Sequence, residues 1–164
     1  MPIRHATTAD LPGILAIYND VIATSTAIYL DEPVTLASRE AWLADKEANG
    51  FPLLVADEGG AIAGFGSYGH FRPFHGYRFT VEHSVHVAAA HRGKGLGRML
   101  VQALLPLARA QGKHIMLGAI DGDNAASIRF HEQLGFVQTA RMPQLGCKFG
   151  RWLDLVIMQR PLDE

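Results

Sequence analysis

The stretch HRGKGLGRM, residues 91–99, places three glycines at alternating positions and follows a β-branched run, SVHV, at residues 84–87. Glycine lets a backbone approach a ligand closely, and the first turn of a helix has unpaired N–H groups and a partial positive charge. Since residues 98–112 read as an amphipathic helix, the stretch is typical of an anion-binding turn between a strand and a helix. A flexible surface loop is the plain alternative.

Two familiar nucleotide-binding loops do not fit this turn. A Walker loop requires GxxxxGK[ST], but no serine or threonine follows Lys94 and the glycine spacing differs. A Rossmann turn requires GxGxxG and an acidic residue about 20 positions further on. Here the glycines are spaced GxGxG, and the next strand ends at Asp121, too far away. The turn therefore favours a diphosphate that belongs to neither class of cofactor.

Composition indicates one globular domain spanning residues 1–164, with 48% hydrophobic and 19% charged residues. The formal net charge of −1 gives no support for nucleic acid or an anionic membrane as a partner. The apolar runs are far shorter than the roughly 20 residues that span a bilayer. MPIRHATTADLPG lacks a signal-peptide pattern, and the single cysteine, Cys147, suits a reducing compartment. We expect a soluble cytoplasmic protein.

The eight histidines raise the question of a metal site. No HExxH or CxxC motif and no HxxxH pair on a helix is present. His83 and His86 are three positions apart in an expected strand, so they point to opposite faces. The sequence therefore predicts no metal.

The hydrophobic pattern predicts an α/β sheet, antiparallel early and mixed later, with helices on both faces. Thr8 is the expected N-cap of the first helix, and Gly50 and Gly135 are expected to end the second and the last. The expected strands cover residues 2–6, 52–57, 61–69, 79–87, 114–120, 136–143 and 148–162. The expected helices cover residues 7–22, 36–50, 98–112 and 124–134.

The strand before the glycine turn carries a candidate general base. In TVEHSVHV, residues 80–87, strand periodicity places Glu82, Ser84 and His86 on one face and His83 on the other. A carboxylate just upstream of an anion-binding turn can act as a general base toward a bound substrate. A solvated or salt-bridged strand carboxylate is the alternative interpretation of Glu82.

The last expected helix places Asn124, Ser127 and His131 on one face. Asparagine is favoured at helix caps, so a plain cap is one interpretation of Asn124. A surface histidine is the plain interpretation of His131.

The irregular segment HFRPFHGYR, residues 70–78, is the candidate substrate pocket. A substrate that carries a carboxylate would need a cation, and Arg72 and Arg78 offer bidentate guanidinium groups. Phe74 and Tyr29 are candidate apolar walls. An exposed basic loop is the alternative.

The spacing of Arg92, Gly95 and Gly97 matches R/Q-x-x-G-x-G/A, the acetyl-CoA pyrophosphate loop of the GNAT superfamily of N-acetyltransferases. About 30 residues later, NAASIRFHEQLGF resembles the second GNAT signature, and the order of strands and helices also matches. The resemblance implies the GNAT fold: a mixed, mostly antiparallel central sheet flanked by helices on both faces.

Within that superfamily the chain resembles the phosphinothricin acetyltransferase branch, which includes the methionine sulfoximine and methionine sulfone N-acetyltransferases. SYGHFRPFHGYRFTVEHSVHV and GCKFGRWLDLVIMQ carry this likeness. The resemblance implies direct acetyl transfer from acetyl-CoA to the α-amine of a small amino-acid-like substrate, as in detoxification of such analogues, by a homodimer. A covalent route through Cys147 is a minor alternative.

The resemblance also implies residue roles. Glu82 is implied as the base, and His131 stands where many GNAT enzymes have a tyrosine acid. The residues implied in cofactor binding are Val85, His86, Val87, Arg92, Gly93, Lys94, Gly95, Leu96, Gly97, Arg98, Asn124 and Ser127. The residues implied or suggested in substrate binding are Arg72, Pro73, Phe74, Arg78, Glu82, His83 and Ser84.

Three points stay open at this stage. Lys94 and Arg98 are either cofactor contacts or solvated charges at the helix entry. Lys148 and Arg151 are further candidates for a substrate carboxylate, across a dimer interface. The thiolate's proton donor and the physiological substrate are not determined.

Two other functions compete with this hypothesis. The amine could be a polyamine, an aminoglycoside or a protein N-terminus, although an arginine-rich rather than acidic pocket disfavours polycations. The chain could also be an idle acyl-CoA-binding module, which the presence of Glu82, Asn124 and His131 argues against.

Overall fold

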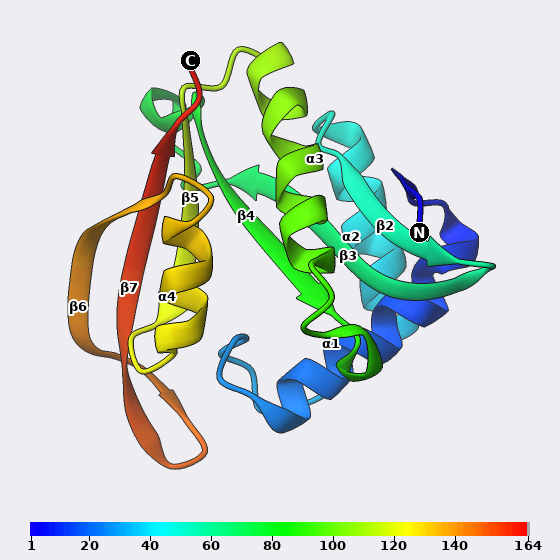
Figure 1. The fold of residues 1–164 in the computed structure, drawn as a ribbon, viewed down its shortest axis with the longest axis horizontal. Coiled ribbons are helices and arrows are strands. Elements are labelled where there is room, and N and C mark those ends of the chain that lie inside the picture. The colour runs from blue at the N-terminus through cyan, green and yellow to red at the C-terminus, as the bar shows by residue number, and fades with distance from the viewer. Residues whose placement is uncertain (164) are drawn as a thin grey trace.

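The computed structural model describes residues 1–163, in which strands and helices alternate largely as the sequence predicts (Figure 1). The strands of this part of the chain form one sheet in the order β1-β2-β3-β4-β5-β7-β6. In sheet order they are β1 (Ile3–His5), β2 (Leu53–Glu58), β3 (Ala61–His70), β4 (Thr80–Val87), β5 (Ile115–Asp121), β7 (Arg151–Pro161) and β6 (Val137–Lys148). The expected α/β sheet is confirmed.

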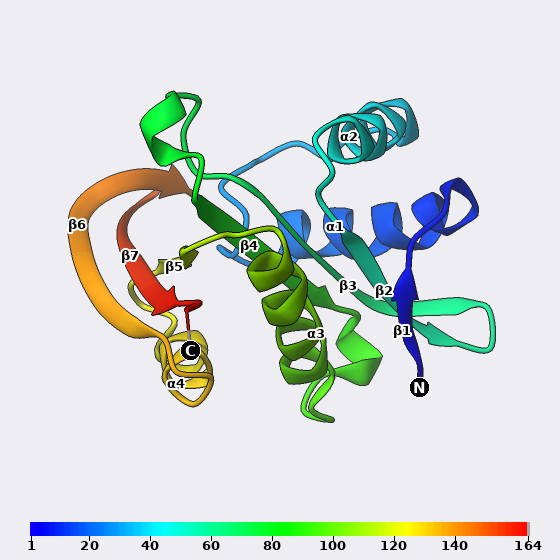
Figure 2. The same cartoon turned by 90° about the horizontal axis from the view of Figure 1, so that it is seen from above.

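The helices lie on both faces of the sheet (Figure 2). On one face, α1 (Leu11–Thr24) and α2 (Leu36–Ala48) pack against β2 and β3. On the other face, α3 (Leu96–Ala110) and α4 (Ala125–Glu132) pack against the centre of the sheet. None of the helices in the described range is long and apolar enough to cross a membrane.

The first helix begins later than the sequence predicts. Thr8 is not its cap: residues Thr8–Asp10 form a 3-10 turn, and Thr7 has the cap position of that turn. The Asp10 carboxylate accepts hydrogen bonds from the Arg4 guanidinium at 2.8 Å and from the Thr7 backbone N–H at 2.7 Å. These bonds fix the tight turn, so α1 starts at Leu11, directly before a proline.

The C-terminal strands also have different bounds from those predicted. β6 continues through residues 144–148 instead of ending near residue 143, and Lys148 belongs to β6 rather than to the last strand. Phe149 and Gly150 both have positive φ, 52° and 68°, and reverse the chain. Two irregularities in the β6 register absorb the extra residues, which a pattern of alternating polarity does not reveal.

The hydrophobic core lies mainly between α3 and the sheet. Leu100, Leu104 and Ala108 on α3 are fully buried and belong to one cluster with Val81 of β4 and Met116 of β5. Each buried leucine stabilises the fold by roughly 1.5–3 kcal/mol relative to an exposed one. This packing holds β4 and β5 against α3.

The centre of the sheet contains its one parallel pair in the described range, β4 with β5, and all other neighbours are antiparallel. The β4–β5 pairing covers only residues 80–82 and 115–117. Beyond these pairs the two strands diverge toward their carboxyl ends (Figure 1). The backbone of each strand therefore lacks a neighbouring strand on that side, and a gap opens within the sheet.

Candidate active site

The glycine turn at the start of α3 adopts a conformation that requires glycine. Gly93 and Gly95 have φ values of 75° and 79°, in the left-handed region, and Gly95 is the N-cap of α3. No atom lies within 4 Å of a Cβ built at either position, so the requirement comes from backbone conformation and not from space. The exposed turn presents the free N–H groups of the first turn of α3 to solvent.

Two of the basic side chains around this turn bond to backbone carbonyls of the chain just before it. Arg92 Nε donates to the Val87 carbonyl, and Lys94 Nζ donates to the Ala90 carbonyl, both at 3.1 Å. Arg98 is exposed on the first turn of α3. Arg92 and Lys94 therefore shape the turn, and Arg92 Nη2 also lies 3.8 Å from the Asp20 carboxylate of α1.

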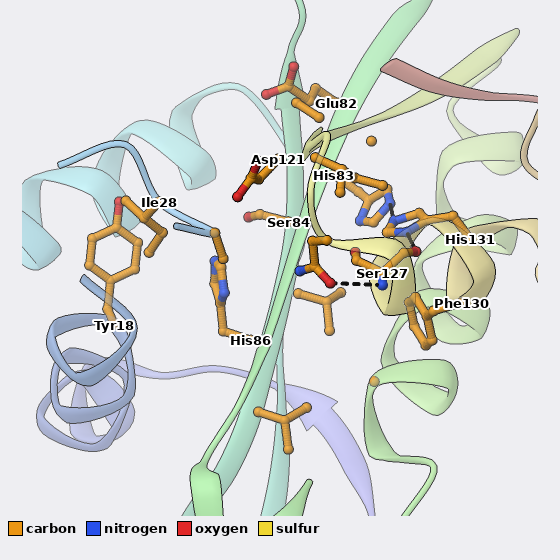
Figure 3. Close-up of a pocket in the computed structure, with 18 residues that line it drawn as sticks. Tyr18, Ile28, Glu82, His83, Ser84, His86, Asp121, Ser127, Phe130 and His131 are labelled. Atoms are coloured by element: carbon orange, nitrogen blue, oxygen red, sulfur yellow. Dashed lines mark hydrogen bonds between the residues drawn. The ribbon is translucent and has the colours of Figure 1, made fainter. Parts of the chain in front are cut away.

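A cavity of about 410 Å³ lies where β4 and β5 diverge (Figure 3). Its volume is within the range of small-molecule sites. Glu82 lines one part of this cavity and Gly97 of α3 lines another, so one continuous space connects the glycine turn with the candidate base. The other lining residues are Tyr18, Ala27, Ile28, His83, Ser84, Val85, His86, Val87, Gly118, Ala119, Ile120, Asp121, Asn124, Ser127, Phe130 and His131.

The cavity has two chemically different sides because β4 alternates as predicted. Glu82, Ser84 and His86 face the side of α1, whereas His83 faces α4 and its His131 (Figure 3). Asp121, at the end of β5, projects on the same side as Glu82 (Figure 3). Two carboxylates therefore lie on the α1 side, and two buried histidines lie on the α4 side.

Glu82 is half-buried on the α1 side of the cavity. Within residues 1–163 it forms neither a salt bridge nor a side-chain hydrogen bond, so the salt-bridged alternative is wrong for this part of the chain. Burial raises the pKa of the Glu82 carboxyl. A carboxylate of raised pKa with free oxygens is suited to accepting a proton.

His131 is buried, so the surface-histidine alternative is wrong. Its Nδ1 donates to the Ser127 carbonyl at 2.7 Å, and its Nε2 lies 3.1 Å from His83 Nε2. The two rings stack with centroids 5.1 Å apart, and both lie edge-on to Phe136. Sequence reasoning placed His83 and His131 in the site but did not predict this contact.

The hydrogen bonds determine where the protons of the pair lie. A carbonyl only accepts, so His131 Nδ1 carries a hydrogen, and in the neutral ring its Nε2 is the acceptor. His83 Nε2 then donates to it, and His83 Nδ1 is left as a buried acceptor with no partner among the described residues. Burial lowers the pKa of His83 to about 3 and also lowers that of His131, so both rings are neutral near pH 7.

Gly118 of β5 makes room for the histidine pair. A Cβ at this position would lie 3.0 Å from His131 Nε2 and 3.1 Å from His83 Nε2. Sequence reasoning missed this residue. A glycine inside an expected strand is a usable signal, since it often marks a close approach of another group.

Asn124 is the N-cap of α4, as its interpretation as a helix cap predicted. Its side-chain oxygen accepts from the Ser127 N–H at 3.0 Å, which leaves the amide NH₂ free on a residue that lines the cavity. Ser127 and His131 follow on the same side of α4 (Figure 3). The cap and a contact with a ligand are therefore compatible.

The predicted substrate segment lies outside the cavity. Arg72, Pro73, Phe74 and Arg78 are all exposed between β3 and β4, and none of them lines the cavity. The two guanidinium groups lie over neighbouring rings, with Arg78 4.3 Å from the centroid of Phe79. In the described chain the structure does not bring this segment together with Glu82, His83 and Ser84.

Lys148 is not available to a substrate, which corrects its assignment as a candidate. The side chain is buried, and its ammonium donates to three backbone carbonyls. Arg151 and Cys147 are exposed on the β6–β7 hairpin and do not line the cavity. The position of Cys147 gives no support to a covalent route through this thiol.

The cavity also contains residues that sequence reasoning did not propose. Ala27 and Ile28 come from the loop after α1, Tyr18 from α1 itself, and Asp121 from the end of β5. Asp121 carries a signal, because a polar residue at the carboxyl end of a strand often serves a site. The described residues hold no cluster of three or more side chains suited to a metal ion.

Comparison with known proteins gives a consistent result. Residues 14–136 match the acetyltransferase (GNAT) family. The chain is 57% identical to an L-methionine sulfoximine/L-methionine sulfone acetyltransferase of Pseudomonas aeruginosa, over 98% of this chain and 94% of that protein. It is 38% identical to a phosphinothricin N-acetyltransferase of Alcaligenes faecalis, over 98% of this chain and 82% of the relative.

Solved structures extend the likeness to three dimensions. A Salmonella typhimurium protein, solved with its cofactor acetyl-CoA, superposes with a TM-score of 0.96 at 50% sequence identity. The superposition covers 99% of this chain and 94% of that one. The fold, the sheet with its flanking helices, is therefore shared over the whole length of the domain.

Proposed function

The chain belongs to the GNAT family of acetyltransferases, and we propose that it acetylates the α-amine of a small amino acid analogue, of the methionine sulfoximine, methionine sulfone or phosphinothricin type. Acetyl-CoA is the acyl donor. The observation that carries the proposal is the single cavity that connects the start of α3 with Glu82.

The residues present fit coenzyme A. The left-handed glycines open the turn, so the N–H groups of residues 93–98 are free for a diphosphate at the start of a helix. In the diverging part of the sheet, the backbone of Val85, His86 and Val87 borders the cavity and would hold the pantetheine arm. Asn124 would donate its free amide N–H groups from the cap of α4. Bound there, acetyl-CoA supplies the activated acetyl thioester.

We propose that Glu82 takes the proton from the substrate ammonium, which leaves the amine neutral and nucleophilic. Its free oxygens and its raised pKa support this role. The buried carboxylate of Asp121 on the same side adds negative charge that favours a cationic amine. Ser84 lines the same cavity and offers a hydroxyl to the substrate.

The proposed part of His131 follows from its protonation state. Near pH 7 the ring is neutral, and its one N–H is donated to Ser127. It can therefore deliver a proton to the departing sulfur only after it has taken one up at Nε2, which His83 contacts. We propose that His131 relays a proton released by the amine, with His83 as its partner.

The substrate carboxylate needs a cation, and no arginine or lysine lines the cavity in the described chain. Arg72 and Arg78, which precede β4 and Glu82 along the chain, remain the proposed source of that cation. Their guanidinium groups have no carboxylate partner among the described residues. Replacing each by glutamine tests them, since a carboxylate contact predicts a raised KM for the amino acid and an unchanged Kd for acetyl-CoA.

We also propose that the protein is a homodimer that uses the outer side of the β6–β7 hairpin. Trp152 is 68% exposed and Phe149 is 52% exposed, which is unusual for large apolar side chains on one hairpin. Trp152 is paired in register with Cys147, which is also exposed, so both project from the same side. Sedimentation of wild type and of Trp152→Glu tests this proposal, and a wild-type monomer would refute it.

The experiment that tests the proposed function is a thiol-release assay with acetyl-CoA and a panel of acceptors. The panel contains the three amino acid analogues, a polyamine, an aminoglycoside and a peptide with a free N-terminus. We expect turnover with the amino acid analogues. Turnover with the other amines alone would replace the substrate class, and tight acetyl-CoA binding without any turnover would indicate a binding module.

A further inference from the structure

Lys148, near the end of β6, is a buried lysine that acetyl transfer does not use. Its side chain is 1% exposed, and its ammonium donates to the carbonyls of Ile22, Ser25 and Ile28, each at 2.7 Å. All three acceptors lie in the last turn of α1 or in the segment that follows it. The three N–H groups of one ammonium are therefore all used to hold this one stretch of backbone.

Burying an ammonium is costly unless each of its donors is bonded. The carbonyls at the end of a helix lack partners within the helix, and the negative end of the helix dipole favours a cation there. Lys148 supplies a cation at the C-terminus of α1, and all of its donors are bonded there or in the segment that follows. It thereby fixes the path of residues 25–29, which we call the 25–29 loop.

Two further contacts hold the same loop. The Thr26 hydroxyl donates to the Asp121 carboxylate at the end of β5. The Tyr29 ring packs directly on Gly146 of β6, where a Cβ would overlap the ring, and its hydroxyl donates to the Asp154 carbonyl at 3.4 Å. The loop is therefore attached to β5 through Asp121, to β6 through Lys148 and Gly146, and to β7 through the Asp154 carbonyl.

The loop forms one wall of the cavity. Ala27 and Ile28 line it together with Glu82 and Asp121. Ile28 lies on the α1 side (Figure 3). Glu82 and the loop therefore border the same cavity, to which the glycine turn contributes Gly97. The loop contains no residue of the glycine turn, so its displacement should affect the acceptor at Glu82 before it affects the diphosphate at the start of α3.

We propose that Lys148 is a positioning residue that fixes the 25–29 loop beside Glu82 and so determines which amines reach the base. The part that concerns the acceptor rests on the proposed function. The apolar side chains of Ala27 and Ile28 limit the size of the acceptor side chain that fits the cavity.

The test compares Lys148→Met with Lys46→Met. Lys46 is a matched control because its ammonium also donates to a backbone carbonyl, that of Tyr68, at 2.8 Å, but it holds no residue of the 25–29 loop. For Lys148→Met we expect faster hydrogen exchange in the 25–29 loop and at least a tenfold rise in the KM of the acceptor, since misplacement by about 1 Å costs that much or more. The Kd for acetyl-CoA should stay within about twofold in both variants, because the coenzyme seat is untouched.

Equal loop exchange in Lys148→Met and wild type, or a parallel loss of acetyl-CoA affinity and acceptor affinity, would overturn the proposal. Should Lys148→Met fail to fold, Lys148→Gln decides by the same measurements, because an uncharged amide has two N–H groups and cannot replace all three bonds of the ammonium. Loop exchange is measured without turnover. An inactive wild type would therefore refute the proposed function. The comparison of hydrogen exchange between wild type and variant would still show whether Lys148 fixes the 25–29 loop.

Discussion

Replacing Gly118 by alanine tests the histidine pair. The new Cβ would lie 3.0 Å from His131 Nε2 and 3.1 Å from His83 Nε2, closer than ordinary van der Waals contact. The two rings have little room to move away, because Phe136 packs behind them. The centroids of the His83 and His131 rings lie 5.4 and 5.3 Å from the centroid of the Phe136 ring. The substitution must therefore move the two rings apart or shift β5.

Overpacking of this kind costs roughly 1–3 kcal/mol. For a chain of this length each kcal/mol corresponds to about 2–4 °C, so the Tm should fall by about 2–12 °C. Activity should fall at least tenfold if the relay depends on this geometry, since displacement by about 1 Å has such effects. Both quantities follow from thermal unfolding and from the thiol-release assay.

Gly76→Ala is the matched control. No atom lies within 4 Å of a Cβ at this exposed position, and its φ is not positive, so its Tm should change by no more than about 1–2 °C. Equal Tm values for the two alanine variants, with wild-type activity in both, would refute the tight packing of the histidine pair.

Two other predictions concern the coenzyme turn and the N-terminal turn. Gly95→Ala forces a non-glycine residue to a φ of 79°, so it should cost about 1 kcal/mol and weaken acetyl-CoA binding in calorimetry; an unchanged Kd would contradict the proposed seat. The Arg4 guanidinium lowers the pKa of Asp10 to about 2, below its ordinary 3.8, so this carboxylate contributes stability above pH ~4 that is lost as the pH falls toward 2. Urea unfolding should show that Asp10→Asn loses roughly 1–2 kcal/mol at pH 7 and little at pH 2; an equal loss at both would contradict this.

Local features of the site could be predicted from the sequence. The spacing of the glycines predicted a turn that opens a helix, and Gly93 and Gly95 have the positive φ that only glycine adopts easily. The alternation of β4 placed Glu82 and His83 on opposite faces, as the structure shows. The periodicity of α4 placed Asn124, Ser127 and His131 together, and all three line the cavity.

Features that depend on contacts far apart in the chain could not be predicted. The cavity exists because the pairing of β4 and β5 ends after residue 82, which no pattern within either strand encodes. Lys148 looked like a free cation, yet its acceptors lie more than 100 residues away in sequence. The exposed position of Arg72 and Arg78 likewise follows from how β3 and β4 end, and not from the residues themselves.

The central claim is that Glu82 is the general base, and Glu82→Gln tests it most directly. Glutamine keeps the size of the side chain but cannot accept the proton, so kcat/KM should fall roughly 10²–10⁴-fold while the Kd for acetyl-CoA is unchanged. Because burial raises the pKa of Glu82, wild-type kcat/KM should rise with pH as the carboxyl loses its proton, and this rise should disappear in the variant. A variant that keeps the wild-type kcat/KM from about pH 6 to about pH 9 would show that another group takes the proton.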